Sequence, residues 1–376
     1  MTEIHPQNRD PAVDGARPAA PAIAGAQANH DADRRPILVV PYMWIGDFVR
    51  CHTVVRLLNA RFPTRPVDVL ATSLTAPLVD YMPGVRQGIV GDMPRRRLGL
   101  GEQRRLARRL RREGYGTALI MSRKWKAALA PFLAGIPERV GFAGEGRFIL
   151  LNDIRWGERN LARMIDQCAS LTQPSGAPLP ELPVPQLVVK PGEIAAWLRG
   201  RGLTDGSRRV VALAPGAVGP SKRWPAASYG EVARSLVEDG GDVWVLGSPS
   251  ERALAAEIVT LAGANARDLT GPDLRDAILA LAAADAVVSN DSGLLHVAAA
   301  LGTPAIGIFG PTSPVLWAPL NPIAATITTH TDVPCRPCHE PVCRYGHHRC
   351  MRDIPAAQVL EPLRRALAPA SAKAMS

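Results

Sequence analysis

The sequence predicts an α/β protein made of two halves, each built around a parallel β-sheet. Short β-branched runs alternate with helix-forming stretches, which is the pattern of parallel strands joined by crossover helices. Many prolines fall within residues 173–189, so this stretch is interpreted as a linker between two such series. A chain of 376 residues also exceeds one ordinary hydrophobic core, which favours two domains.

The first half begins with the apolar run Pro-Ile-Leu-Val-Val at 36–40, which predicts a buried strand. A turn is expected at 42–47, followed by a helix over about 48–59. The further strands of this half are expected at 67–71, 117–121 and 139–142.

The second half repeats the alternation of strands and helices. Its strands are expected at 210–213, 243–246, 286–289 and 305–309, and its helices at 228–238, 251–261, 294–301 and 356–367. Ligands of such folds bind at the carboxyl ends of the strands, so we expect the site in a cleft between the two halves.

The predicted boundaries divide the chain into a disordered tail (1–35), an N-terminal Rossmann-like domain (36–185), a C-terminal one (186–355) and a last helix with a tail (356–376). The N-terminal tail lacks the apolar core of a signal peptide. No apolar run is long enough to span a bilayer. With 47% hydrophobic and 21% charged residues the chain has the composition of a globular protein, and we expect it to be cytoplasmic.

The net charge of +10 is carried mostly by arginine, and part of it is concentrated in one stretch. The arginines of this stretch are Arg95, Arg96, Arg97, Arg104, Arg105, Arg108, Arg109, Arg111 and Arg112. Leu106 and Leu110 give its second half an apolar helical stripe, which places the arginines there on a solvated face. Such a face is either an ordinary surface helix or a patch for an anionic membrane, glycolipid or nucleic acid. Nucleic acid is disfavoured, because no recognised motif and no interleaved aromatic residues are present.

The stretch 287–296 predicts a strand, a tight turn and the start of a helix. Ser292 is a suitable N-cap residue and Gly293 lies just inside the helix, so free backbone N–H groups are available to phosphate oxygens. Asp291 and His296 flank the turn, and Asp291 can accept hydrogen bonds from sugar hydroxyls. The alternative is an ordinary βαβ unit whose Asp291 and Ser292 only cap the helix.

The first turn contains Trp44-Ile45-Gly46-Asp47, which places Asp47 at a helix start facing the expected cleft. This carboxylate could act as a general base, or it could merely cap its helix. No G-x-G-x-x-G sequence follows any predicted strand, which argues against a nicotinamide or flavin cofactor. The only D-x-D sequence, at 31–33, falls in the predicted tail and is attributed to chance.

Two further loops follow strands of the second half. Lys222 and Arg223 suit a diphosphate, because lysine supplies a compact positive charge and arginine can donate two parallel hydrogen bonds. The Trp-Pro pair at 224–225 is expected to restrain their loop. The alternative for them is a solvated basic turn. Glu251 either holds ribose hydroxyls or is a first-turn glutamate favoured by the helix dipole.

Four of the six cysteines fall within sixteen positions, at Cys335, Cys338, Cys343 and Cys350. A cytosolic protein is not expected to form disulfides, and the spacing suits a structural zinc ion. An iron–sulfur cluster or a set of reduced thiols are the alternatives. The segment follows the last strand, so we expect it to lie away from the strand ends that form the cleft. Cys51 and Cys168 are expected to be buried thiols.

Three separated motifs resemble those of glycosyltransferase family 9, the ADP-heptose:lipopolysaccharide heptosyltransferases. Residues 290–296 with Gly310-Pro311-Thr312 resemble the family signature, residues 215–217 with 222–225 its second motif, and residues 44–47 its N-terminal motif. Residues 135–142 and 151–153 resemble the heptosyltransferase II branch more than the first-heptose branch, and segment 335–350 resembles a version seen in some members. The resemblance covers residues 36–367.

The resemblance implies a GT-B fold, in which the N-terminal domain binds the acceptor and the C-terminal domain binds ADP-heptose. It implies an inverting, metal-independent transfer of heptose to the heptosyl-Kdo2-lipid A inner core, as the second heptose, at the cytoplasmic face of the inner membrane. Transfer of the first or third heptose, and a non-catalytic nucleotide-sugar-binding protein, are the alternatives.

The family's functional residues carry over by position. Asp47 would be the general base, Lys222 would stabilise the departing diphosphate, and Glu251 would bind ribose. The other substrate-binding residues would be Gly216, Arg223, Asp291, Ser292, Gly293, His296 and Thr312.

Overall fold

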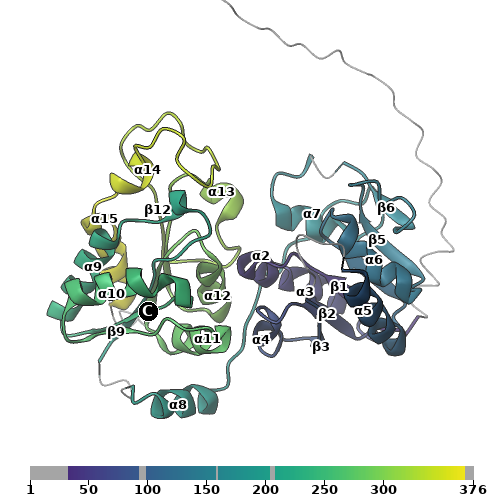
Figure 1. Ribbon diagram of the computed structural model, residues 1–376, viewed down its shortest axis with the longest axis horizontal. Coiled ribbons are helices and arrows are strands. Elements are labelled where there is room, and N and C mark those ends of the chain that lie inside the picture. The colour runs from purple at the N-terminus through teal and green to yellow at the C-terminus, as the bar shows by residue number, and fades with distance from the viewer. Residues whose placement is uncertain (1–32, 93–98, 158–159, 204–207, 369–376) are drawn as a thin grey trace, which may run out of the picture. The chain divides into compact units, whose positions relative to one another are not determined.

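The computed structural model describes residues 33–92, 99–157, 160–203 and 208–368, and its contacts place the described residues from Arg34 onward in one compact unit. This part of the chain contains two six-stranded sheets, and the strand pairs within them are parallel (Figure 1). The predicted α/β class is therefore confirmed. The predicted boundaries of the two domains, 36–185 and 186–355, are not tested by the fold class and stay a prediction.

The first sheet has the strand order β3-β2-β1-β4-β5-β6. Its strands are β1 (Ile37–Val40), β2 (Val67–Ala71), β3 (Val85–Val90), β4 (Thr117–Ile120), β5 (Glu138–Phe142) and β6 (Asp153–Arg155). The helices of this half are α2 (Ile45–Arg50), α3 (His52–Arg61), α4 (Ala76–Val79), α5 (Leu100–Glu113), α6 (Trp125–Ala134) and α7 (Met164–Ser170). The order reverses between β1 and β4, so the turn after β1 lies at the switch point where such sheets bind ligands.

The second sheet has the order β12-β11-β10-β7-β8-β9. Its strands are β7 (Val210–Ala214), β8 (Asp242–Val245), β9 (Ala266–Asp268), β10 (Ala286–Asn290), β11 (Ala305–Ile308) and β12 (Ala325–Ile327). Its α-helices are α8 (Pro191–Gly200), α9 (Ala226–Glu238), α10 (Arg252–Ala262), α11 (Leu274–Ala283), α12 (Gly293–Leu301), α13 (Pro314–Trp317), α14 (Arg349–Arg352) and α15 (Ala356–Leu367), with short 3₁₀ turns η2 (Pro220–Lys222) and η3 (Pro249–Glu251). Here β10 and β7 form the switch point.

The edge strands β3, β6, β9 and β12 have no counterpart among the strands predicted from the sequence. These strands are partly exposed, so they lack the continuous apolar run that marks β1 or β10. The helix expected at 48–59 is two helices, because the chain breaks at Cys51. Residues 173–189 form neither helix nor strand, as expected of a linker.

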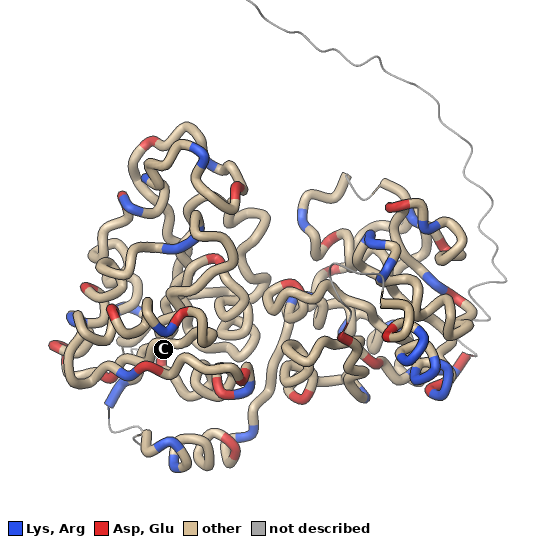
Figure 2. Tube along the Cα trace, in the orientation of Figure 1, with Lys and Arg blue, Asp and Glu red and all other residues tan. Residues whose placement is uncertain are grey.

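Helix α5 carries the second half of the arginine-rich stretch. Its apolar face buries Leu106, Ala107 and Leu110, and its arginines are exposed. Figure 2 marks the positions of these arginines in blue along the helix. The solvated face predicted for them is confirmed, whereas Arg95, Arg96 and Arg97 lie outside the described residues. None of the described helices combines the length and the apolarity that a membrane-spanning helix needs.

One hydrophobic cluster contains side chains of both halves, among them Phe48 of α2 and Leu295 of α12. Helices α2 and α12 are in contact, and each directly follows the central strand of its own sheet. The hydrophobic core therefore joins the two switch points.

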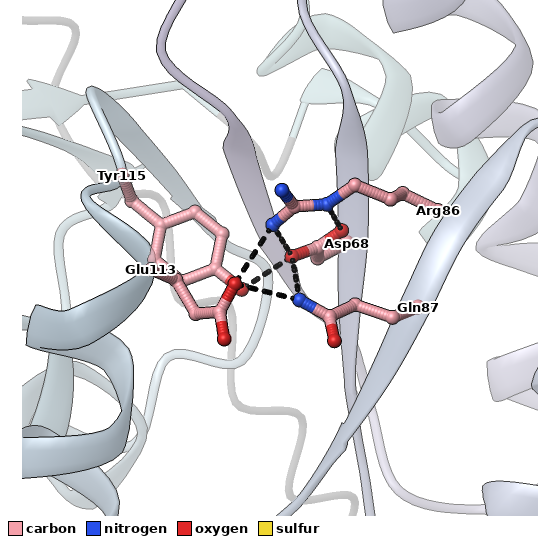
Figure 3. Close-up of polar contacts among 5 residues, drawn as sticks. All are labelled: Asp68, Arg86, Gln87, Glu113 and Tyr115. Atoms are coloured by element: carbon pink, nitrogen blue, oxygen red, sulfur yellow. Dashed lines mark hydrogen bonds and ion pairs between the residues drawn. The ribbon is translucent and has the colours of Figure 1, made fainter.

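A network of polar side chains surrounds Asp68, near the amino end of β2 (Figure 3). The Asp68 carboxylate is fully buried and accepts hydrogen bonds from Arg86, Gln87 and Tyr115. Glu113 accepts from Arg86 and Gln87 at the outer side of the network. Burial and the bond to Asp68 raise the pKa of Tyr115, so its hydroxyl remains a donor.

Candidate active site

The amino ends of α2 and α12 touch through two glycines. A Cβ atom on Gly46 would lie 2.8 Å from His296 Cδ2, and a Cβ atom on Gly293 would lie 2.7 Å from Ile45 Cβ. Both distances are shorter than real contacts, so this approach requires glycine at both positions. The close approach brings the turn after β1 against the turn after β10.

Asp47 lies in the first turn of α2 and is 24% exposed. The N-cap residue of this helix is Trp44, so Asp47 is not the cap that the alternative interpretation required. Burial raises the pKa of Asp47, the like charge of Asp291 raises it further, and Arg50 and Lys222 oppose the shift. A carboxylate whose pKa is raised towards the working pH is better suited to accept a proton.

Lys222 and Asp291 form an ion pair between the loops after β7 and β10. Lys222 Nζ lies 2.7 Å from Asp291 Oδ2, and the carboxylate is 7% exposed. Both groups were predicted to bind the ligand, and in the structure they also pair with each other. An ammonium group has three N–H donors, so Lys222 can hold Asp291 and still donate to a phosphate oxygen.

The buried amide of Asn290 fixes the loop that carries Lys222. Its Nδ2 donates to the Pro215 carbonyl at 2.7 Å, and its Oδ1 accepts from the Trp224 backbone N–H at 3.2 Å. These two bonds hold the loop on either side of Lys222. Asn290 lies inside the predicted turn but is not among the predicted site residues.

Two hydroxyls predicted to bind substrate or cap a helix, those of Ser292 and Thr312, lie in the loops after β10 and β11. Ser292 is the N-cap residue, but its side chain makes no cap hydrogen bond and lies 3.0 Å from the Ser289 hydroxyl. Thr312, in the loop after β11, is 4% exposed, and its hydroxyl has no hydrogen-bond partner among the described residues. Uncapped backbone N–H groups and an unpaired buried hydroxyl are the groups that an anionic ligand can satisfy.

Glu251, in η3, lies against two glycines, Gly216 after β7 and Gly247 after β8. A Cβ atom on Gly216 would lie 1.6 Å from Glu251 Oε1, and one on Gly247 would lie 2.8 Å from Oε2. Oε2 also accepts from the backbone N–H of Ser248 at 2.7 Å, in a capping box. Glu251 therefore lies in the first turn of η3, as the alternative expected, and also closes a capping box there; Gly216 is required for its position, and its ribose role stays a prediction.

His296 and Arg223 occupy contrasting positions. His296 is 6% exposed, and burial lowers its pKa well below the ordinary value, with Arg50 and Lys222 acting in the same direction. A neutral imidazole therefore packs against α2 at neutral pH. Arg223 is exposed, and its Nε donates to the Ala217 carbonyl at 3.2 Å.

Arg50 is a site residue that the sequence analysis missed. It is 3% exposed, lies 3.8 Å from Asp47, donates to the Trp317 carbonyl and stacks over the Trp317 ring at 5.3 Å. It also lines a cavity of about 150 Å³ together with Arg163, Ile165 and residues 314–316 and 318–320. Nothing in the local sequence distinguishes it, because arginine is abundant in this chain and common on exposed helix faces.

The cysteine-rich segment, residues 335–350, lies against the site loops rather than away from them, which corrects the expectation. Its four cysteines line a small pocket together with His347, His348, Ser221 and Pro311. Backbone N–H groups, first that of His348, hold the pKa of Cys343 below its usual value, whereas burial raises that of Cys350 to about 11.

The same side chains do not form a metal site as they lie. Within the described residues, no group of three or more His, Cys, Asp or Glu side chains is arranged to hold a metal ion. Cys335 Sγ lies 3.8 Å from His347 Nε2, and His347 Nδ1 accepts from the Arg349 backbone N–H. A neutral His347 therefore carries its proton on Nε2 and cannot ligate through that atom. The zinc site stays a prediction.

Comparisons with known proteins agree with this geometry. Residues 103–348 match the model of a family described as glycosyltransferase family 9 (heptosyltransferase). Lipopolysaccharide heptosyltransferase 2 of Escherichia coli is 36% identical over 340 residues, which cover 87% of this chain and 97% of that protein. Lipooligosaccharide heptosyltransferase 2 of Haemophilus influenzae is 33% identical over 346 residues, covering 88% and 99%.

Solved structures show the same architecture. The structure of E. coli ADP-heptose lipopolysaccharide heptosyltransferase II is similar with a TM-score of 0.77 and 34% identity, covering 88% of this chain and 98% of that one. E. coli heptosyltransferase WaaC with ADP is similar with a TM-score of 0.66 and 18% identity, covering 88% and 99%, which shows the fold alone. The two parallel sheets and the first match confirm the predicted GT-B fold.

Proposed function

The chain belongs to glycosyltransferase family 9, and from that premise we propose that it transfers L-glycero-D-manno-heptose from ADP-heptose to the heptosyl-Kdo2-lipid A inner core, as the second heptose. The relatives named heptosyltransferase 2, which match over most of the chain, support this choice over a first- or third-heptose transfer. The observation that carries the mechanism is the contact of α2 with α12, which brings Asp47 close to the Lys222–Asp291 pair.

Inversion requires that the acceptor oxygen attack the anomeric carbon on the face opposite to the departing ADP. Asp47 takes the proton of the acceptor hydroxyl, and the oxygen forms the new bond as the bond to the diphosphate breaks. The electron pair of that bond leaves with ADP. Lys222 and the uncapped N–H groups at the start of α12 stabilise the negative charge that develops there.

Donor binding uses the Thr312 hydroxyl, which has no hydrogen-bond partner in the described part of the chain, together with the remaining bonding capacity of Lys222 and Glu251. The Thr312 hydroxyl donates to a phosphate or heptose oxygen, and Lys222 bridges Asp291 and the diphosphate. Glu251 keeps its cap bond and presents its other oxygen to the ribose hydroxyls. Positive charge from side chains and the helix end does the work of a divalent cation, so we propose that transfer is metal-independent.

The acceptor is a lipid, so the enzyme works at a membrane surface. We propose that it binds peripherally to the cytoplasmic face of the inner membrane, and the exposed arginines of α5 supply the positive charge that anionic headgroups attract. Lipid A carrying the inner core and the anionic surface are its partners, without nucleic acid.

The proposal is tested by incubating the purified protein with ADP-heptose and a panel of truncated lipopolysaccharides that end at successive inner-core sugars. We expect release of ADP and a mass gain of one heptose with the acceptor that already carries one heptose. Transfer to an acceptor that ends at Kdo would instead identify a first-heptose transferase. Donor binding without transfer to any acceptor would support the non-catalytic alternative.

A further inference from the structure

The cysteine-rich segment, residues 335–350, contacts two loops of the proposed donor site. The first is the Lys222 loop, residues 215–222, which follows β7. The second is the Thr312 loop, residues 309–313, which follows β11. The mechanism proposed above assigns no task to the cysteine-rich segment.

Contacts with the Lys222 loop centre on Ser221, the residue before Lys222. Its backbone N–H donates to the Pro341 carbonyl at 3.2 Å, and its hydroxyl donates to the Glu340 carbonyl at 2.5 Å. The Ser221 carbonyl lies 2.6 Å from His348 Nε2. A carbonyl can only accept, so His348 Nε2 carries the proton and donates. Every backbone polar group and the hydroxyl of Ser221, itself 3% exposed, is therefore in a hydrogen bond to this segment.

Contacts with the Thr312 loop follow the same pattern. Arg336 donates from Nε to the Gly310 carbonyl at 2.7 Å and from Nη2 to the Phe309 carbonyl at 3.3 Å. The Pro311 carbonyl accepts the backbone N–H groups of residues 338 and 339 at 3.0 and 2.9 Å. Three consecutive carbonyls just before Thr312 are thus held by the cysteine-rich segment.

The backbone of the segment is strained at the places where it holds the loops. His339 and His348 have φ values of 57° and 52°, in the left-handed region that non-glycine residues rarely adopt. His339 contributes a backbone donor to Pro311, and His348 contributes the ring donor to Ser221. Strain of this kind persists where surrounding contacts determine the conformation.

We propose that the cysteine-rich segment positions the donor site. His348 fixes the position of Lys222 through its hydrogen bond to Ser221, and Arg336 fixes the position of Thr312 through its hydrogen bonds to the carbonyls of Phe309 and Gly310. His348 and Arg336 are positioning residues, because each acts on the donor through a loop. The inference rests on the proposed function in that the ligand of both loops is the ADP-heptose donor. An error of about 1 Å in such groups is enough to slow an enzyme strongly.

The test compares four single variants of the full-length protein. His348→Ala removes the donor to Ser221, and His348→Gln restores an N–H near the position of Nε2. Arg336→Ala removes the bonds to the Thr312 loop. Arg344→Ala is the matched control, because Arg344 belongs to the same segment but is exposed and stacks on the Tyr345 ring at 5.2 Å.

We measure kcat and KM for both substrates, the Kd of ADP by calorimetry, and the melting temperature. His348→Ala and Arg336→Ala should each raise the donor KM and the Kd of ADP by about three- to tenfold, the range expected for loss of one or two hydrogen bonds. The acceptor KM should be unchanged, His348→Gln should recover most of the loss, and Arg344→Ala should behave as wild type. In a Lys222→Ala background, His348→Ala should weaken ADP binding by less than about twofold, because it acts through Lys222.

The inference is overturned if His348→Ala and Arg336→Ala bind ADP as tightly as Arg344→Ala. It is also overturned if they lower the melting temperature and change both substrates equally, which is the result of a purely structural role. Failure of the proposed function gives a different result. A wild type that binds ADP but transfers no heptose would overturn that function, and weaker ADP binding by His348→Ala would still support the positioning role.

Discussion

Asp68 and Asp47 are both carboxylates of the first half, but their surroundings differ. The surroundings of Asp68 suit a residue that stabilises the fold, and those of Asp47 suit a residue that takes part in a reaction. Asp68, near the amino end of β2, is fully buried and accepts hydrogen bonds from three side chains. Asp47 follows the carboxyl end of β1, where Arg50 lies 3.8 Å away and the like charge of Asp291 is close. A buried carboxylate that accepts hydrogen bonds from several donors stabilises the fold. A carboxylate whose pKa is raised by burial and a neighbouring negative charge is better suited to accept a proton.

Asp47→Asn should have the largest effect on activity. Removal of a general base costs about 10²–10⁴ in kcat. The affinity for ADP should remain nearly unchanged, because Asp47 does not contact the groups assigned to the diphosphate. Steady-state kinetics and calorimetry measure the two quantities. A variant that turns over at the wild-type rate would show that Asp47 is not the base.

The raised pKa of Asp47 predicts a pH dependence with a definite sign. The acid limb of kcat/KM should titrate above about 3.9, the ordinary value for aspartate. The folded state holds this proton more tightly than the unfolded state, so ionised Asp47 destabilises the fold at neutral pH and the penalty disappears as pH falls through the folded pKa. Asp47→Asn should therefore melt higher than wild type at pH 7, and this difference should vanish at low pH.

Lys222→Ala should reduce kcat/KM by about 10- to 100-fold, because a charge-assisted hydrogen bond to the diphosphate is lost. The variant also leaves the nearly buried Asp291 without its cation, so ADP binding should weaken. Wild-type activity should survive EDTA. Activity that is lost in EDTA and restored by magnesium or manganese would show that a cation does the work assigned to Lys222, provided that the protein remains folded.

Asp68→Asn should show the opposite pattern to Asp47→Asn. Loss of the buried acceptor leaves donors of Arg86, Gln87 and Tyr115 poorly matched, which should lower the free energy of unfolding by about 1–3 kcal/mol. Denaturant unfolding measures this change. Turnover at a temperature where the variant is folded should equal that of wild type. A lower kcat at that temperature would show that Asp68 contributes to catalysis as well as to stability.

Substitution of the cysteines of segment 335–350 should have the smallest effect on the rate of transfer. The sequence spacing predicts about one zinc per chain in protein purified without added metal, measured by elemental analysis. Cys338→Ser combined with Cys343→Ser should lower the melting temperature. Iron with visible absorbance would indicate a cluster, and metal-free protein of equal stability would leave reduced thiols.

The sequence by itself determined the central elements and most of the site loops. The strands β1 and β10 and the helix α15 coincide with their predictions within a residue or two, because apolar periodicity and turn residues are local properties. The polar ends of the central strands predicted Asp47, Lys222 and Asp291 as site residues, and the structure brings these three close together. Edge strands were missed, since their half-exposed residues lack a distinct pattern.

Only the tertiary structure decided what these residues contact. The pairing of Lys222 with Asp291 spans 69 positions, and that of His348 with Ser221 spans 127. Arg50 is buried because α13 packs over it, and the cysteine-rich segment lies on the Lys222 and Thr312 loops because the chain returns there after β12. Such contacts depend on how elements that are distant in the sequence pack against one another, and no local pattern of residue types determines that packing.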